Sequence, residues 1–375
     1  MKSRLPALLV CLCALALSAP SAAQLSVRDD LNRTLIVKKT ATRVVTLAPF
    51  LTEIVFAAGA GDLAVGVDDL SDYPARAASL PRVPTGASLA LERIAQLKPD
   101  LILAWRDGIR REDVDKLTAA GATVYVAVAR ELEDIPRLMR VVGHLTGRDP
   151  TRAIGEFEGK LAQLRRENAF KVKMPTFIEI WNRPLTTVSG NHFLSEAIEI
   201  CRGENVFAEL RASAPKVTWE QVQSKNPMVI VGAGSASSLG EFRANWQLRQ
   251  TMAAVRDERL LFVTDDKISR LTPRTPDGIA KLCADLDNVR AGRVQRVVDT
   301  SAAAAKSGGA AAAGLGGFIP SVANPVGPLP AASPASPTPS QPPATTDAPA
   351  AAAPEPAPAP APATPPRKRP SQYGL

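Results

Sequence analysis

The sequence predicts the α/β fold class: two similar α/β lobes with mostly parallel sheets, joined by one long backbone helix, with a ligand cleft between the lobes. Three observations lead to this prediction. Short apolar strands alternate with amphipathic helices, two successive helical segments interrupt this alternation once, and one helix–strand unit occurs twice. Strands that alternate with helices form parallel sheets covered on both faces, and ligands bind such sheets outside the carboxyl ends of the strands.

The repeated unit reads LERIAQLKPDLILAW in residues 91–105 and WEQVQSKNPMVIVGA in residues 219–233. Each copy has a glutamate in an amphipathic run (Glu92 and Glu220), a proline seven residues later, and then an apolar strand. The residue before a proline is biased away from helical geometry, so each helix is expected to stop there. The repeat predicts that both lobes share one architecture.

The first lobe is expected at about residues 43–130, after a short hairpin at 27–39. Its strands are apolar and rich in β-branched residues, and its helices have apolar residues on one face. The strands are expected at 43–48, 63–67, 101–105 and 123–128, and the helices at 51–60, 89–97 and 111–121.

A long helix is expected between the lobes, at about residues 150–171, because no strand pattern appears between residues 131 and 171. One face of this helix is apolar at a spacing of three to four residues, with Ile154, Phe157, Leu161 and Leu164. At 1.5 Å per residue the helix would be about 30 Å long.

The second lobe is expected at about residues 174–293, where the alternation of strands and helices resumes. The strands are expected at 176–181, 228–232 and 259–264, and the helices at 192–203, 219–226, 245–256 and 276–290.

The two ends of the chain differ in composition from the part expected to fold, residues 24–300. Residues 1–23 have a basic start, an apolar stretch and a small-residue end, which are typical of a secretory signal peptide cleaved after Ala23. Residues 301–375 are mostly Ala, Pro, Gly and Ser, and they are expected to be disordered because they cannot bury enough apolar surface. This tail is either solvated with no specific role, or a spacer or cell-wall contact. We expect a soluble protein exported to the periplasm.

The charge does not indicate a nucleic-acid partner. The formal net charge is +8, from 45 basic and 37 acidic residues, but the two ends hold six of the basic and two of the acidic residues. The remaining 39 basic and 35 acidic residues leave +4 on the part expected to fold. No basic stripe with interleaved aromatic residues appears there, so we expect no nucleic acid among the partners.

Only two cysteines, Cys201 and Cys283, remain once the signal peptide is removed. In an oxidising compartment an even pair on a folded domain is typical of a disulfide. The alternative is two buried free thiols.

Four segments resemble the periplasmic binding proteins of ABC importers for cobalamin, iron–siderophores and haem: RVVTLAPFLTEIVFAAGAGDLAVGVDDLSDYP, LERIAQLKPDLILAWRDG, IEICRGENVF and SRLTPR. The resemblance covers residues 43–288 and is greatest to the cobalamin receptors of the family. It implies a monomeric receptor, not an enzyme and with no cofactor of its own. Such a receptor would capture cobalamin or a related corrinoid and deliver it to an ABC permease–ATPase complex at the inner membrane. An iron–siderophore or haem receptor is the alternative.

The resemblance also implies a docking role for two carboxylates. In such receptors one exposed glutamate per lobe forms salt bridges with arginines of the two permease subunits, and Glu92 and Glu220 match those positions. A symmetric transporter presents the same basic patch twice, so a receptor with two similar lobes needs the same acid twice. The alternative is that each glutamate only favours a helix start, worth about 0.3–1 kcal/mol. The resemblance further implies that Cys201 is bonded to Cys283.

The ligand-binding residues are expected at strand ends and in the loops that follow them: Trp105, Phe50, Leu70, Trp181, Asp266 and Arg270. Trp105 matches a ligand-stacking tryptophan of the family, although a tryptophan at a strand end can also be a core residue. Three aromatic residues of the cobalamin pocket are replaced, by Leu70, Gly86 and Ala214. Phe50, Tyr73 or Trp181 would have to take their place, so iron chelates and haem stay open as ligands.

A periplasmic hydrolase that uses Ser189 and His192 is the minor alternative. The letters SGNH are contiguous here, whereas the hydrolase family of that name takes them from separate blocks, and no G-x-S-x-G elbow is present. Asn191 is expected to cap the next helix. The two histidines, His144 and His192, are too few for a metal-binding cluster, so any metal is expected to arrive within its chelate.

Overall fold

The computed structural model describes residues 25–86, 88–234, 236–264 and 266–293, all of which belong to one unit of the chain, Met1–Pro325. The predicted signal peptide and the predicted tail lie outside the described residues. Among the helices that are described, none is long and apolar enough to cross a membrane.

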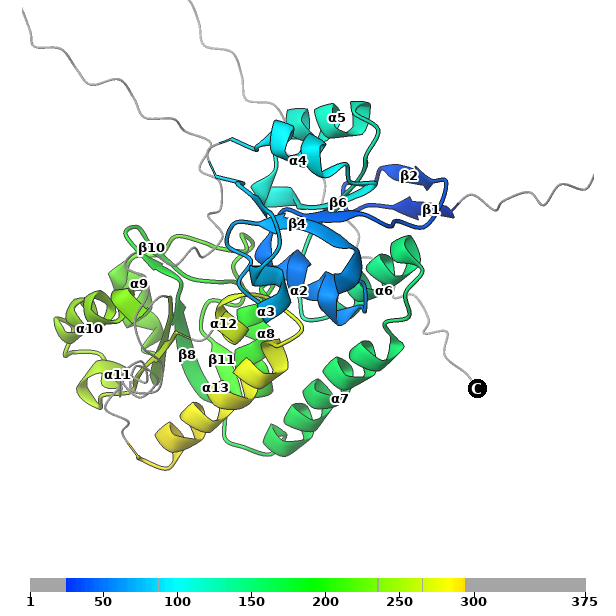
Figure 1. Cartoon of the computed structure of the whole chain (residues 1–375). Helices are drawn as coiled ribbons and strands as arrows, with labels where there is room; N and C mark the ends of the chain where they lie inside the picture. Colours follow the sequence, from blue (N-terminus) through cyan, green and yellow to red (C-terminus); the bar gives the residue numbers. More distant parts are fainter. Residues whose placement is uncertain (1–24, 87, 235, 265, 294–375) are drawn as a thin grey trace, which may run out of the picture. The chain divides into compact units, whose positions relative to one another are not determined.

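The first lobe is built on a sheet of five parallel strands in the order β5–β4–β3–β6–β7. Strands β4 and β6 of this sheet are labelled in Figure 1. A separate antiparallel hairpin, β1 with β2, comes before it. The strands are β1 Leu25–Arg28, β2 Thr34–Val37, β3 Val44–Thr46, β4 Ala64–Asp68, β5 Arg82–Val83, β6 Leu101–Trp105 and β7 Thr123–Ala127. The chain leaves β3 toward β4 on one side and returns to β6 on the other. The strand order therefore reverses between β3 and β6, which is where open α/β sheets bind ligands.

Helices cover both faces of this sheet. Side chains of α4 and α5, such as Ile94 and Leu117, form one core with Val45, Ile102 and Val124. The other face packs against α2 and α6. The helical segments of this half are α2 Pro49–Ala57, η2 Gly61–Leu63, α3 Ala75–Ala78, α4 Leu91–Leu97, η3 Arg106–Gly108, α5 Arg111–Ala119 and α6 Asp134–Thr146.

The second lobe has a four-stranded parallel sheet in the order β11–β8–β12–β13, with a small hairpin of β9 and β10 after β8. Here the strand order reverses between β8 and β12. The strands are β8 Met174–Glu179, β9 Trp181–Asn182, β10 Leu185–Thr186, β11 Gly203–Asn205, β12 Val229–Ala233 and β13 Leu260–Val263. Both sheets thus have the same kind of switch point, as the repeated sequence unit predicts.

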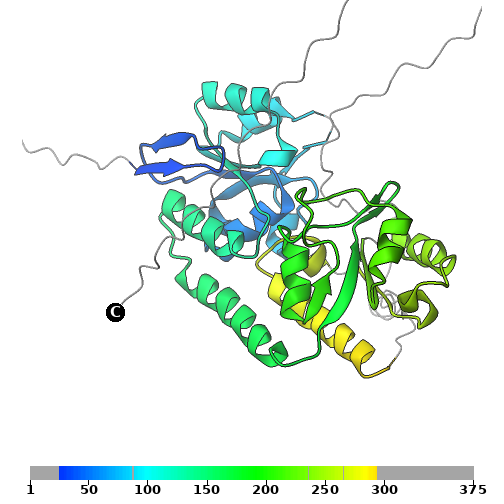
Figure 2. The same ribbon diagram turned by 180° about the vertical axis from the view of Figure 1, so that it is seen from behind.

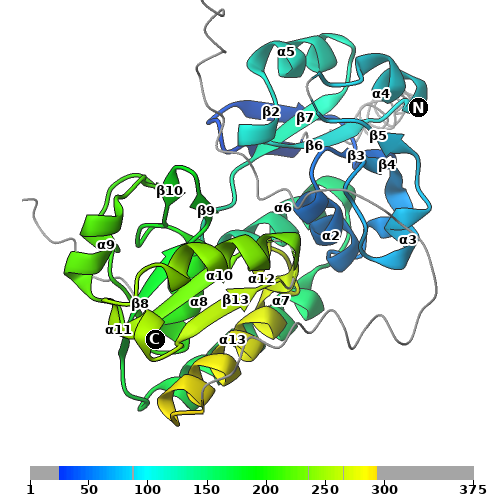
Figure 3. The ribbon, with the colours of Figure 1, turned by 90° about the vertical axis from the view of Figure 1, so that its left-hand side faces the viewer.

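The second sheet is also covered on both faces (Figure 3). One face forms a core with α9, α10 and α11, in which Phe177, Ile230, Phe242 and Trp246 are buried. The other face packs against α8 and α13. The helical segments are α8 Phe193–Ile200, α9 Trp219–Lys225, η4 Ala236–Ser238, α10 Leu239–Gln247, α11 Ala253–Arg256, α12 Asp266–Ser269 and α13 Thr275–Arg290.

The long helix is α7, Thr151–Asn168, which Figures 1 and 2 show from opposite sides. Its buried residues include the predicted apolar face of Ile154, Phe157, Leu161 and Leu164. These side chains belong to one core with residues of both sheets, and α7 contacts α6, α8 and α13. Because both lobes are packed on the same helix face, α7 is a structural connection and not a flexible linker.

The two copies of the repeated unit have the same local structure. Each is a seven-residue helix, α4 or α9, whose C-cap residue is left-handed: Lys98 has φ 45° and Asn226 has φ 43°. A proline follows each cap, and then a strand, β6 or β12. Each glutamate is the second residue of its helix. The predicted helix, stop and strand are confirmed in both lobes.

One predicted helix is wrong. The segment 245–256 is not continuous, because α10 ends at Gln247 and α11 begins at Ala253. Trp246 and Met252 are both buried, whereas Leu248 between them is largely exposed. A single helix would place Trp246 and Met252 on different faces, so the chain breaks to bury both.

Candidate functional site

The switch point of the first sheet carries two aromatic side chains. Phe50 is the second residue of α2, which follows β3, and Trp105 is the last residue of β6. Their rings meet edge to face, with centroids 6.5 Å apart. Both side chains are partly exposed, so they retain apolar surface at the carboxyl end of the sheet. Trp105 also packs against Gly108, where a Cβ atom would lie 2.8 Å from the indole ring.

The loop after β4 lies beside this switch point in the strand order. Asp68 at the end of β4 is buried, and its carboxyl group accepts hydrogen bonds from the Leu70 N–H at 2.9 Å and from the Thr85 hydroxyl. Burial raises the pKa of Asp68. These bonds fix the loop, in which Leu70 and Tyr73 are both exposed.

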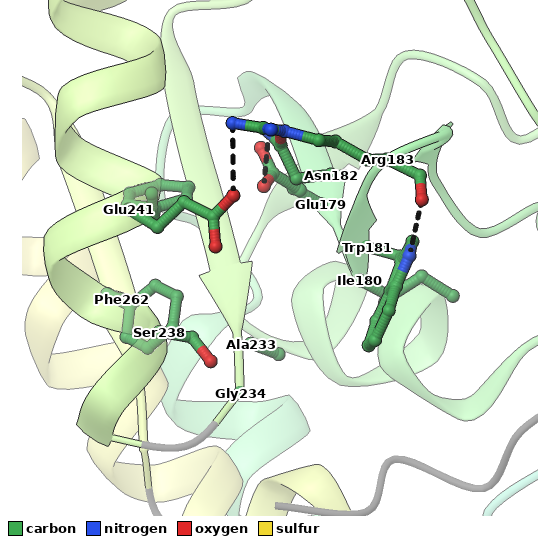
Figure 4. A pocket seen from close by; sticks show the side chains of 11 residues that line it. Glu179, Ile180, Trp181, Asn182, Arg183, Ala233, Gly234, Ser238, Glu241 and Phe262 are labelled. Carbon is green, nitrogen blue, oxygen red and sulfur yellow. Dashed lines mark hydrogen bonds and ion pairs between the residues drawn. The ribbon is translucent and has the colours of Figure 1, made fainter. Parts of the chain in front are cut away.

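The switch point of the second sheet contains a pocket of about 180 Å³ (Figure 4). The residues that line it come from the ends of β8, β12 and β13, from the β9 hairpin and from α10: Glu179, Ile180, Trp181, Asn182, Arg183, Ala233, Gly234, Ser238, Glu241, Phe242 and Phe262. Trp181 is 57% exposed, and its indole N–H donates to the Arg183 carbonyl at 2.9 Å. The predicted ligand-binding residue Trp181 therefore lines a real recess.

A glycine explains how this recess forms. Gly232 lies opposite Glu179 in the pairing of β12 with β8. A Cβ atom at Gly232 would lie 2.6 Å from the rings of both Phe242 and Phe262. The absence of a side chain at Gly232 thus allows close ring packing at the pocket.

Glu179 is the buried acid of the pocket, with only 6% of its surface exposed. Its carboxylate accepts hydrogen bonds from the Trp246 indole N–H at 2.6 Å and the Asn182 amide at 3.3 Å. Burial raises the pKa of Glu179, while these two hydrogen bonds and the charge of Arg249 oppose the rise. Near it, Arg183 and Glu241 form an ion pair at 3.5 Å.

Two other predicted ligand-binding residues lie near the start of α13. Asp266 is the first residue of α12, and its side chain is outside the described part of the structure. Arg270 donates to Asp72, in the loop after β4 of the first lobe, at 3.1 Å. Arg274 donates two hydrogen bonds to Glu53 of α2, at 2.7 and 2.6 Å, and its guanidinium lies 4.0 Å from the centre of the Tyr73 ring. Arg270 and Arg274 therefore connect the two lobes.

Glu92 and Glu220 are both exposed. The pKa of Glu220 is lowered, first by a hydrogen bond to its own backbone N–H and then by one from Thr218. Thr218 also forms a capping box with Gln221, whereas α4 has no side-chain cap. The N-terminal cap of α9 is therefore formed by Thr218 and Gln221, and not by Glu220.

The structure confirms the predicted disulfide between Cys201 and Cys283, which ties the end of α8 to α13. The alternative of two free thiols is wrong. Within the described residues, no group of three or more His, Cys, Asp or Glu side chains could hold a metal ion.

The helix cap near Ser189 was predicted wrongly. His192, and not Asn191, caps α8, because its Nδ1 accepts a hydrogen bond from the Leu194 N–H at 3.2 Å. Burial lowers the pKa of His192 to about 4, which keeps this nitrogen neutral and able to accept. Ser189 is fully buried, and its hydroxyl accepts from the Asn191 N–H. Both side chains thus serve the local backbone.

Glu179 and Glu241 were not predicted as site residues from the sequence. Glu179 had one usable signal, since it is the only charged residue in the otherwise buried strand β8. A charge at the carboxyl end of a buried parallel strand favours a place at a ligand site. Glu241 had no such signal, because it is an exposed charged residue of a helix and not part of a buried strand.

Two parallel-sheet lobes on a common helix, each with an aromatic switch point, define a class of ligand-binding protein. The sequence model described as "Periplasmic binding protein" matches residues 44–266, and the chain belongs to this family. It is a binding protein and not an enzyme, and family membership implies the periplasm.

Three similar proteins share one description. The vitamin B12-binding protein of Vibrio parahaemolyticus serotype O3:K6 (strain RIMD 2210633) is 34% identical over 251 residues, which cover 66% of this chain and 90% of that protein. That of Vibrio cholerae serotype O1 (strain ATCC 39541 / Classical Ogawa 395 / O395) is 34% identical over 248 residues, 66% of this chain and 89% of that protein. The crystal structure of the periplasmic vitamin B12 binding protein BtuF of Vibrio cholerae has a TM-score of 0.59 and 32% identity, over 67% of this chain and 98% of that one.

Proposed function

We propose that this protein captures cobalamin or a related corrinoid between the carboxyl ends of its two sheets and delivers it to an ABC permease–ATPase complex at the inner membrane. The observation that carries the proposal is the similarity to vitamin B12-binding proteins, which extends over about nine-tenths of their length. We further propose that residues 1–23 are a signal peptide removed on export, that residues 24–300 fold as the binding domain, and that residues 301–375 are a disordered tail.

Aromatic surface at both switch points supports a ligand with a large ring system. Phe50 and Trp105 offer partly exposed rings in the first lobe, and Trp181 offers one in the second. Aromatic side chains supply large contact areas at little conformational cost, which suits a macrocycle. In this proposal Leu70 adds aliphatic contact, and Arg270 contacts the ligand if it releases Asp72 when the ligand enters.

Docking is assigned to Glu92 and Glu220. A helix that precedes a parallel strand runs antiparallel to it, so the starts of α4 and α9 lie at the edge where the strands end. Each exposed carboxylate is then presented at the ligand-binding edge of its lobe, where a permease must engage to receive the ligand. A permease with two equivalent basic patches would contact both lobes at once.

Binding is tested by titrating the mature protein with cyanocobalamin while following tryptophan fluorescence. We expect quenching in the wild type and at least tenfold weaker binding for Trp105→Ala. The matched control is Trp219→Phe, because Trp219 lies on α9 under Arg249, whose guanidinium is 3.4 Å from the ring centre. This control should keep wild-type affinity. A wild-type protein that ignores cyanocobalamin would contradict the proposal.

A receptor for an iron–siderophore or haem is the second candidate. It is favoured by Leu70, Gly86 and Ala214, which stand where the resemblance leads one to expect aromatic walls and provide no ring surface. Quenching of the same tryptophans by haem or a ferric siderophore, with no response to corrinoids, would establish it.

A further inference from the structure

The pocket between β8 and β12 is too small for a whole macrocycle. Its volume is about 180 Å³. Sites for drug-sized ligands measure ~300–1,000 Å³. The pocket can therefore receive only a side group of a ligand whose ring system lies outside it, against Trp181.

The polar lining offers hydrogen-bond acceptors and donors together. The carboxylates of Glu179 and Glu241 are acceptors, while the Asn182 amide and the Arg183 guanidinium are donors (Figure 4). Rings and aliphatic side chains, among them Phe262, form the rest of the wall. A primary amide matches such a lining, because it carries N–H donors and a carbonyl acceptor on one small planar group.

The charges of the lining discriminate against an anion. Two carboxylates line the pocket and only one guanidinium, and that guanidinium already pairs with Glu241. Arg249 also acts on Glu179, but it stacks on Trp219 and does not line the pocket. A ligand carboxylate placed here would be a third one, would be repelled by Glu179 and Glu241, and would leave hydrogen-bond acceptors facing each other.

We propose that this pocket is an amide subsite, which receives a neutral primary amide from the periphery of the ligand and rejects a carboxylate in the same place. The inference rests on the proposed function and sharpens it. The side chains around a cobalamin ring end in primary amides, whereas those of haem end in propionates that are ionised at neutral pH. The subsite thus favours corrinoids over haem despite the missing aromatic walls.

The test compares cyanocobalamin with a set of its monocarboxylic acids, in each of which one peripheral amide has been hydrolysed. Calorimetric titration of the mature protein at pH 8 should show at least one acid binding at least tenfold more weakly than cyanocobalamin. In the variant Glu179→Gln the ratio of the dissociation constant of this acid to that of cyanocobalamin should fall below threefold, because the repelling charge is gone. The glutamine carbonyl can still accept from Trp246, so the fold should be retained.

A second variant tests the same charge effect at an exposed residue, where the substitution should not affect folding. Glu241→Gln changes a largely exposed side chain and frees Arg183 from its ion pair, so the discriminated acid should bind better than in the wild type. The control is Glu209→Gln, which removes the same charge from an exposed pair with Lys225 outside the pocket and should leave the ratio unchanged.

The outcomes separate the two proposals. If cyanocobalamin binds but all the acids bind equally well, or if neither pocket variant narrows the ratio, the amide subsite is overturned and the corrinoid receptor stands. If no corrinoid binds the wild type, the proposed function itself is overturned, and the subsite with it.

Discussion

The ion pair between Arg274 and Glu53 should be among the most costly polar contacts to break. The Glu53 carboxylate is only 3% exposed and receives two hydrogen bonds from Arg274. Replacing Arg274 by methionine leaves a buried carboxylate without this counter-ion, which typically costs about 3–5 kcal/mol. Loss of the contact with the Tyr73 ring adds about 0.5–1 kcal/mol. We expect Arg274→Met to lower the free energy of unfolding by about 3.5–6 kcal/mol, the sum of the two contributions.

The assay is urea unfolding at pH 7.5 of Arg274→Met, Glu53→Gln and the double variant. The double variant should be more stable than Arg274→Met alone, because a neutral glutamine costs less to bury than a carboxylate. The control is Arg152→Met, whose ion pair with Glu156 joins side chains that are 93% and 60% exposed and should contribute little to stability. The prediction is refuted if Arg274→Met lowers the free energy of unfolding no more than Arg152→Met does. It is also refuted if the effects of Arg274→Met and Glu53→Gln on the free energy of unfolding are additive in the double variant.

Three further predictions follow. Glu92→Arg and Glu220→Arg should each weaken binding to the permease–ATPase complex in nanodiscs, and the effect should be larger at low salt. Neither variant should change ligand affinity or the melting temperature. Unchanged docking of the double variant would refute the docking role. Replacing Cys201 and Cys283 by serine should cost about 4 kcal/mol in urea unfolding, since the closed loop spans 82 residues; a loss under 1 kcal/mol would contradict this. The neutral His192 side chain caps α8, and its contribution to the free energy of unfolding is complete above pH 6.5. As the pH falls toward 4 the protein should lose up to about 3 kcal/mol of stability, because the unfolded chain binds the proton first. The variant His192→Asn should lack this pH dependence, and an equal slope of stability against pH in both proteins would contradict the prediction.

The sequence was most informative where local signals agree with the fold. The two repeat copies could be recognised because a helix, a stop before proline and a β-branched strand leave marks within fifteen residues. Their left-handed caps, Lys98 and Asn226, confirm that these marks describe one structure. Trp105, at the end of β6, was expected at the site because it matches a ligand-stacking tryptophan of the family, and Phe50, in the first turn of α2, because it could replace a missing aromatic wall.

The remaining site residues depend on contacts between distant segments. Glu179 accepts a hydrogen bond from Trp246, which is 67 residues away in the sequence, and Arg274 donates to Glu53, which is 221 residues away. No local pattern encodes such pairs. Arg270 was expected to face the ligand, but its partner Asp72 comes from a loop of the other lobe, which a single strand or helix does not reveal.

The central claim is that the protein carries a corrinoid. The most direct measurement is the absorbance spectrum of the mature protein purified from its native host without added ligand. A corrinoid receptor should show the visible bands of a corrin, bound in a ratio near one per protein and lost on denaturation. A haem Soret band or the charge-transfer band of a ferric chelate in their place would contradict it.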